Sequence, residues 1–278
     1  MTNGVKRKCE RPILLISESY HNADMFYVSG FLAPDRFIYL CQGDSECLIV
    51  SQMEYERAKK ESRVKNIQSY EEYDYLGRLK ATKDPDLATA DMVVAILSSL
   101  NIKKVQVPKD FSLLFGDQLR ARGIEVITAS KLFEEARSVK TQEELEKIKR
   151  AQAVNELAMG RAIDIIKRSK PKNGVLYHEE KPLTSEFLQR EIELEFIRNG
   201  YDADSSIVAS GPGSADPHFT GAGPIMADTP IVIDIYPYGK KERYFADMTR
   251  TVVKGKPSPE IQKMYDAVLE AQNMALNA

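Results

Sequence analysis

The chain has 278 residues, which at roughly 150 residues per domain predicts two domains. Hydrophobic residues make up 43% of the chain and charged residues 29%, which is enough apolar material for a core and too much for a disordered polymer. The 39 basic and 41 acidic residues leave a net charge of −2, which argues against a broad electrostatic grip on nucleic acid or on an anionic membrane.

The cysteines Cys9, Cys41 and Cys47 are odd in number and form no Cys-x-x-Cys motif. This pattern favours neither a disulfide scaffold nor a zinc site built from cysteines, and it fits a reducing compartment. No stretch reaches the ~18 apolar residues that a membrane-spanning helix needs. We therefore expect a cytoplasmic protein without nucleic-acid or membrane partners.

The first half of the chain alternates short apolar runs with helical patterns. Alternation of this kind predicts an α/β domain, in which helices cover a mixed sheet. The expected strands are 12–17, 37–41, 47–51, 104–107 and 125–128, and the expected helices are 86–100 and 111–122.

The pattern changes near residue 137. Thr141 followed by Glu144 is a capping-box sequence, which satisfies free amides at a helix start. A long helix follows, with an apolar stripe at Leu145, Ile148, Ala151, Ala158, Ala162 and Ile165, and it ends before Pro171. We therefore expect domains at 1–136 and 137–278.

The second domain is expected to continue with a polar loop over 170–182 and a helix that starts at Thr184 or Ser185 and stops at Gly200. A strand at 206–209, a Gly/Pro-rich turn and two strands follow. The last predicted helix starts at Ser258, with Pro259 at its first position.

Two aspartates are predicted to face each other across a β-hairpin. If Lys240 and Lys241 form its tip, Asp234 lies directly opposite Asp247 on the same face. Two like charges in such apolar strands repel and resist burial, and a divalent cation between them would offset both costs. The alternative is that both aspartates lie at a solvated sheet edge near the lysines of the tip; the spacing alone leaves both interpretations open.

His218 favours the metal interpretation. It lies in a turn-rich loop after a strand, between Pro217 and an aromatic residue, and such loops carry function more often than packing. The other two histidines, His21 and His178, lie in polar segments and are expected to be solvated surface residues.

Three ordered motifs resemble the Xaa-Pro aminopeptidase/prolidase family of pita-bread metallopeptidases, which includes creatinase. Residues 137–151 resemble the linker-helix signature of this family, 208–218 its first histidine loop, and Asp234 with 247–251 its first two metal ligands. The preceding region resembles a creatinase-type N-terminal domain. The fold that this implies is a creatinase-like N-terminal α/β domain followed by the first half of a pita-bread α+β catalytic domain.

The resemblance also implies a function and a site. Asp234 would bind one metal ion, Asp247 would bridge two, and His218 would contact the substrate or shuttle a proton at the scissile peptide. The two divalent ions (Mn, Co or Zn) would activate water for cleavage of the bond before proline. The implied substrate is a peptide with proline at its second position, and family members are often homodimers.

Two departures from the family pattern stand out. The hairpin tip is longer by two residues near 239–243, an even insertion that keeps each side chain on its face. The family also needs a later histidine and two glutamates, and no histidine follows Asp247. We therefore expect an N-terminal portion of a longer protein, which alone would bind metal weakly and be inactive.

Two alternatives to a peptidase remain at this stage. A creatinase-like amidinohydrolase would depend more on the histidine than on metal, and the two aspartates argue against it. A non-catalytic binding module with a peptidase-like fold is the other alternative. The retention of Asp234, Asp247 and His218 argues against such a loss of activity.

Overall fold

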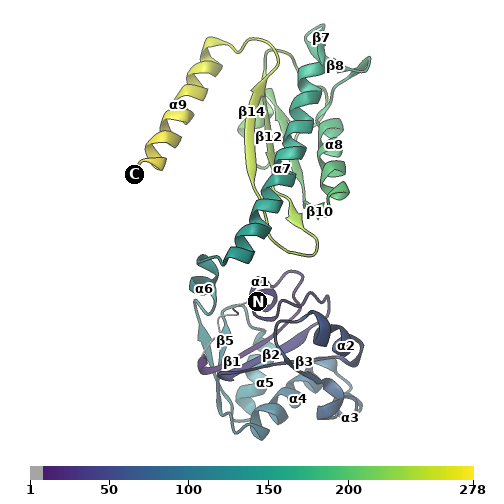
Figure 1. Cartoon of the computed structure of the whole chain (residues 1–278), viewed down its shortest axis with the longest axis vertical. Helices are drawn as coiled ribbons and strands as arrows, with labels where there is room; N and C mark the ends of the chain where they lie inside the picture. The colour runs from purple at the N-terminus through teal and green to yellow at the C-terminus, as the bar shows by residue number, and fades with distance from the viewer. Residues whose placement is uncertain (1–8) are drawn as a thin grey trace. The chain divides into compact units, whose positions relative to one another are not determined.

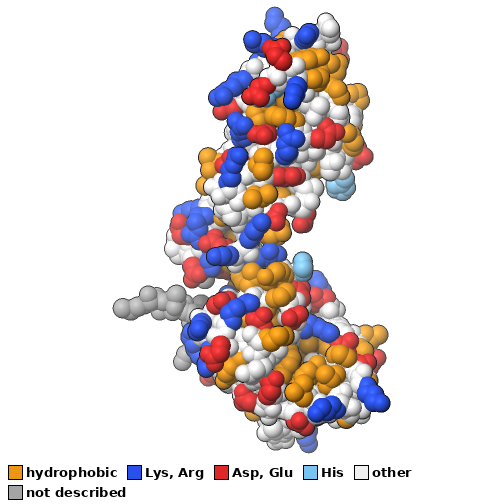
Figure 2. Space-filling view, turned by 90° about the vertical axis from the view of Figure 1, so that its right-hand side faces the viewer, with side chains coloured by type: hydrophobic (Ala, Val, Ile, Leu, Met, Phe, Trp, Pro, Cys, Tyr) orange, Lys and Arg blue, Asp and Glu red, His pale blue; other side chains and the backbone are white. Residues whose placement is uncertain are grey.

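The computed structural model describes residues 9–278. Its internal contacts divide the chain into two compact units, 1–139 and 140–278, each with its own buried core. Within the described part of the chain, no helix combines the length and the hydrophobicity that crossing a bilayer requires. Figure 2 shows Lys and Arg side chains interspersed with Asp and Glu over the face in view, in keeping with the small net charge.

The first unit is built on a six-stranded sheet with the strand order β4-β3-β2-β1-β5-β6. Strand β2 runs antiparallel to both of its neighbours, and the other pairs are parallel. The strands are β1 Cys9–Ser17, β2 Phe37–Gly43, β3 Ser45–Val50, β4 Asn66–Ser69, β5 Lys104–Pro108 and β6 Glu125–Ala129. All five strands predicted for this region are present, and the short β4 is added.

Helices cover both faces of this sheet, as the alternating pattern predicts (Figure 1). Successive strand residues point to opposite faces, so Leu14 and Ile16 pack with the helices at Pro85–Ser99 and Leu113–Ala121, whereas Ile13 and Leu15 pack with those at Ala23–Ser29 and Gln52–Glu61. The helices are α1 Ala23–Ser29, α2 Gln52–Glu61, η1 Tyr70–Tyr73, α3 Tyr75–Thr82, α4 Pro85–Ser99, α5 Leu113–Ala121 and α6 Glu134–Ser138.

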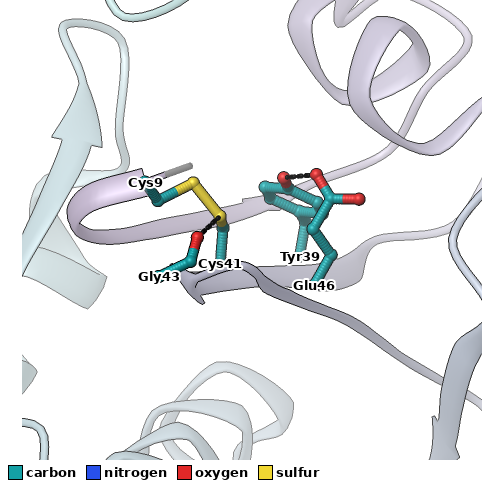
Figure 3. The surroundings of a disulfide bond; sticks show 5 residues. All are labelled: Cys9, Tyr39, Cys41, Gly43 and Glu46. Atoms are coloured by element: carbon teal, nitrogen blue, oxygen red, sulfur yellow. Dashed lines mark hydrogen bonds between the residues drawn. A yellow bond between two sulfur atoms is a disulfide. The ribbon is translucent and has the colours of Figure 1, made fainter. Parts of the chain in front are cut away.

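A disulfide joins Cys9 of β1 to Cys41 of β2 (Figure 3). The two cysteines lie on neighbouring antiparallel strands with Cα atoms 6.3 Å apart, a spacing that a disulfide spans. The two cysteines are 32 residues apart in the sequence, so no local motif indicates that they pair. The pairing of β1 with β2 in the sheet brings them together. The cysteine count therefore no longer supports a reducing compartment, and the cytoplasmic location stays a prediction.

The second unit begins with the long helix α7, Gln142–Arg168. The predicted capping box is present: Thr141 accepts from the Glu144 amide and the Glu144 carboxylate accepts from the Thr141 amide. The predicted stripe is buried from Ala151 onward, whereas Leu145 is exposed.

The remaining elements of the second unit follow the predicted order with one correction. The predicted loop over 170–182 is a small three-stranded sheet, because the turns after Lys172 and His178 fold its polar residues into antiparallel pairs. The elements are β7 Lys170–Lys172, β8 Val175–His178, β9 Lys181–Pro182, α8 Ser185–Arg198, β10 Tyr201–Asp202, β11 Ser206–Ser210, η2 Gly211–Ala215, β12 Pro230–Ile235, β13 Tyr238–Gly239, β14 Met248–Val253 and α9 Pro259–Leu276.

Strands β11, β12 and β14 form an antiparallel sheet with β12 in the centre, and α7 and α8 pack against it. The core between these layers contains Ile231, Ile233 and Ile235 of β12, each 0% exposed. Fully burying an aliphatic side chain of this size contributes about 1.5–3 kcal/mol. No residue of α9, the yellow helix in Figure 1, is buried.

The disulfide and the buried Cys47 predict a specific thiol count. The unreduced chain, denatured, should show one thiol to a chromogenic disulfide reagent, and three after reduction. In the native chain, burial, with the Glu72 carboxylate nearby, raises the pKa of the Cys47 thiol from 9.0 to about 12. Because the thiolate is the reactive form, native labelling at pH 8 should be slower by about three orders of magnitude. A Cys47→Ser control should show no thiol before reduction, and three thiols in the unreduced chain would contradict the disulfide.

Candidate functional site

The register of the aspartate hairpin differs from the prediction. Asp234 lies opposite Thr249, and Asp247 precedes β14, so the predicted direct pairing of the two aspartates is wrong. The cause is the tip, which is a four-residue loop rather than a two-residue turn. The Gly239 amide donates to Tyr244 O at 3.1 Å, and the Arg243 amide donates to Gly239 O at 2.9 Å.

The two aspartates nevertheless share a face of the sheet. A shift of two residues leaves a side chain on its original face, whereas a shift of one reverses it. Ile233 and Ile235 flank Asp234 and are fully buried, so the intermediate exposure of Asp234 places it on the opposite side. Asp247, two residues before Thr249, is exposed. In a regular antiparallel pair such diagonal neighbours lie about 7–8 Å apart, within reach of one bridging group.

Thr249 belongs to this face and was not singled out by the sequence analysis. Its hydroxyl donates to Asp234 Oδ1 at 2.5 Å. The bond fixes the position of one carboxylate oxygen of Asp234. Only the strand register identifies Thr249 as the partner of Asp234, because threonine is common in strands and its presence alone does not indicate a role.

A buried asparagine holds the end of the strand that carries Asp234. Asn155 of α7 is 0% exposed, and its Nδ2 donates to Ile235 O at 3.2 Å. The bond reaches the carbonyl of the last β12 residue in the β12–β14 ladder, where Ile235 pairs with Met248. The Asn155 Oδ1 atom has no hydrogen-bond partner within the described residues. The sequence signal was a polar residue on the otherwise apolar stripe of α7.

The long hairpin tip is fastened to the start of α7. Tyr244 donates its hydroxyl to Glu144 Oε1 at 2.8 Å, and Arg150 pairs with Glu242 at 2.6 Å. Glu144 also closes the capping box with its other carboxylate oxygen, so one side chain fixes both the helix start and the tip. The hydrogen bond from Arg150 to Glu242 raises the pKa of the guanidinium further. These contacts position the segment that leads to Asp247.

His218 lies in an exposed loop that is anchored at both ends. The loop begins at η2, which contacts β11 and β12, and it returns where the Val208 amide donates to Thr220 O at 2.8 Å. Gly221 has a φ of +95°, and a Cβ there would lie 1.8 Å from Val208 O, so this close approach needs glycine. The His218 backbone amide donates to Asp216 Oδ1 at 3.1 Å.

The other histidines have different surroundings. His21 is 86% exposed in its side chain, as predicted. His178 is only 17% exposed, because its ring packs against Phe187 at a centroid distance of 5.7 Å. The expectation of a solvated surface residue is therefore wrong for His178, which is a packing residue of the small sheet.

The described residues supply part of a metal-ligand set. Asp234 and Asp247 offer carboxylate oxygens of the right chemistry for a divalent ion on one face. Within residues 9–278, however, no three or more His, Cys, Asp or Glu side chains come together as a metal site. The donor chemistry fits a metal ion, but the number of donors falls short of the four or more that such ions take.

Replacing Asn155 tests the contact that holds β12. Asn155→Ala removes the buried donor and its hydrogen bond to the carbonyl of Ile235. The free energy of unfolding of the second unit should fall by about 1–3 kcal/mol in urea denaturation followed by circular dichroism. Exposed Glu156 on the same helix is the control, and Glu156→Ala should change stability by less than about 0.5 kcal/mol. Equal effects of the two substitutions would contradict a specific role for Asn155.

Comparisons with known proteins match both units. Residues 13–139 match the family model of the Creatinase/Prolidase N-terminal domain, and residues 146–278 match that of Metallopeptidase family M24. These matches confirm the resemblance and the expected fold class, a creatinase-like N-terminal domain followed by a pita-bread domain.

Individual relatives agree with the family matches. The chain is 26% identical over 258 residues to the Xaa-Pro dipeptidase of Pyrococcus furiosus, covering 92% of the chain and 65% of that protein. An uncharacterized peptidase of Bacillus subtilis, YqhT, is also 26% identical, with the same coverage. The chain thus spans 65% of the length of these relatives.

Solved structures show the same fold. The X-Pro aminopeptidase of Thermotoga maritima has a TM-score of 0.73 at 25% identity, covering 96% of this chain and 69% of that one. The prolidase of Pyrococcus furiosus has a TM-score of 0.70 at 22% identity, covering 95% and 68%.

Proposed function

The chain belongs to metallopeptidase family M24, with a creatinase/prolidase N-terminal domain, and we propose from this premise that it serves the metal-dependent hydrolysis of the bond before proline. The observation that carries the proposal is the aspartate pair, Asp234 in β12 and Asp247 just before β14, in a chain similar to an Xaa-Pro dipeptidase. The proposed substrate is a dipeptide or a longer peptide with proline at its second position.

Each site residue has a proposed role. Asp234, oriented by Thr249, would hold one divalent ion, and Asp247 would take part in holding two. His218, exposed on its anchored loop, contacts the substrate or carries a proton at the scissile peptide. Divalent ions supply Lewis acidity and a water of lowered pKa when they are bound. Mn, Co and Zn all accept such carboxylate ligands.

A non-catalytic binding module remains a second candidate. The observation in its favour is that residues 9–278 bring no three metal-ligating side chains together. A peptide would then be held on the exposed face of the sheet without being cleaved. The two candidates differ in whether metal binding and turnover depend on the same aspartates.

Metal binding should depend on both aspartates. In a calorimetric titration with Mn²⁺, the chain should bind weakly, with a Kd on the order of 10⁻⁴ M or above, as expected for a site with few ligands. Asp234→Asn and Asp247→Asn should each weaken binding at least about ten-fold, because each removes a charged oxygen ligand.

Exposed Asp204 provides the matched control in the same unit, and Asp204→Asn should leave Mn²⁺ affinity unchanged. Wherever proline is released from an Xaa-Pro dipeptide, the release should require metal and should disappear in Asp247→Asn. Tight Mn²⁺ binding that survives Asp247→Asn would remove Asp247 from the site. Metal-independent cleavage of creatine would instead support the amidinohydrolase. Binding of the dipeptide without turnover would support the binding module.

The hydroxyl of Thr249 should act through Asp234. Thr249→Val keeps the shape and removes the donor, so Mn²⁺ affinity should fall by about three- to ten-fold, the equivalent of one hydrogen bond. Thr249→Ser keeps the donor and should restore most of the affinity. If Val and Ser behave alike, the effect is one of packing and Thr249 does not position Asp234.

A further inference from the structure

A crevice lined only by residues of the first unit has a volume of about 250 Å³. Its lining comes from three loops that are distant in sequence. These are the loop after β1 with His21 to Asp24, the turn after β5 with Pro108 to Asp110, and the segment after β6 that contributes Ala129, Ser130, Leu132, Glu134 and Arg137. All of these residues belong to the unit 1–139, whereas His218, Asp234 and Asp247 belong to 140–278.

The topology of the sheet explains why a crevice forms here. Strands β1, β5 and β6 are adjacent and parallel, so their carboxyl ends meet at one edge. From β1 the chain continues through β2, β3 and β4 on one side, and it then crosses to β5 on the other. The direction in which the chain adds strands therefore reverses between β1 and β5. In α/β sheets, ligands bind outside the carboxyl ends of the strands at such a point, because the loops that follow the two strands lead away from each other there.

The crevice carries both signs of charge at short range. Arg137 pairs with Asp24 at 2.7 Å, and Lys109 pairs with Glu134 at 3.1 Å. A guanidinium has five N–H donors and an ammonium three, so both cations keep donors for a ligand. The Asp110 carboxylate, next to Lys109 at the tip of the turn, has no ion-pair partner among the described residues.

The balance of these charges selects the ligand class. The lining has three carboxylates against the lysine and the arginine, and this excess of acidic groups disfavours a free anion such as phosphate. Lys109 and Asp110 present opposite charges side by side. We propose that this crevice binds a small zwitterion, an α-amino acid or a dipeptide with both termini free. The ammonium pairs with Asp110, and the carboxylate is held by Lys109 and Arg137.

The size of the crevice agrees with this class. Pockets for drug-sized ligands have volumes of roughly 300–1,000 Å³, and the present crevice lies just below that range. A ligand of amino-acid or dipeptide size therefore suits it. The inference does not depend on the peptidase proposal, because it uses no residue of the aspartate face.

The test is a titration of the full chain with glycylglycine, followed by amide chemical shifts in the presence of a chelator. The backbone amides of residues 21–24, 109–110 and 129–137 should shift with a common saturable dependence on ligand concentration. Two blocked analogues separate the charges: N-acetylglycylglycine lacks the ammonium, and glycylglycinamide lacks the carboxylate. Each should bind at least about ten-fold more weakly than the zwitterion, because each loses one charge-assisted contact.

Substitutions locate the binding. Asp110→Asn and Lys109→Gln should each weaken glycylglycine binding at least about five-fold, and both side chains are on an exposed turn, so the fold should be kept. Asp44→Asn and Lys103→Gln are matched controls on exposed residues outside the crevice and should have no effect.

Three results would overturn the proposal: no shifts in the three loops, binding unchanged by Asp110→Asn, or phosphate or the acetylated analogue binding as well as the zwitterion. Binding at the crevice that persists in Asp247→Asn separates this inference from the peptidase proposal, and failure of either leaves the other standing.

Discussion

The packing of α7 against the β11-β12-β14 sheet is the contact on which the rest of the second unit depends. Helix α7 is capped at Thr141, buries its stripe from Ala151 onward, and holds the end of β12 through Asn155. Arg161 joins it to Glu191 of α8 at 2.6 Å, and Glu144 joins it to the hairpin tip. The buried aliphatic surface supplies most of the stability, because each hydrogen bond adds only about 1 kcal/mol net.

The candidate site follows from that packing. When the isoleucines of β12 turn toward α7, the period of two forces Asp234 to the other face, where a charge remains solvated. The site is thus a consequence of burial on the opposite side of the same strand. The crevice of the first unit arises differently, from the parting of loops at the carboxyl ends of parallel strands. Two constraints thus position the functional side chains: the alternation of buried and exposed residues along a strand, and the direction in which neighbouring strands run.

Local patterns were predictable where the interactions are local. The capping box at Thr141, the stop at Gly200 and the proline start of α9 each involve neighbours within a few residues, and all are present. Pairings between distant segments were not predictable in the same way. The Cys9–Cys41 disulfide, the pairing of Asp234 with Thr249 and the four-residue tip depend on which strands meet and in what register. The three-stranded sheet over Lys170–Pro182 was missed because its strands are short and polar.

The sequence by itself determined the class of the two domains, five strands of the first, the long helices of the second and the residues of the candidate site, because periodicity and motif spacing are properties of a linear chain. Tertiary structure alone decided that Asp234 and Asp247 are diagonal rather than opposite, that Thr249 and Asn155 hold the site, and that His21, Lys109 and Arg137 line one crevice. The physical reason is that strand register and sheet order bring these residues together. The same local sequence pattern is compatible with more than one register and more than one strand order.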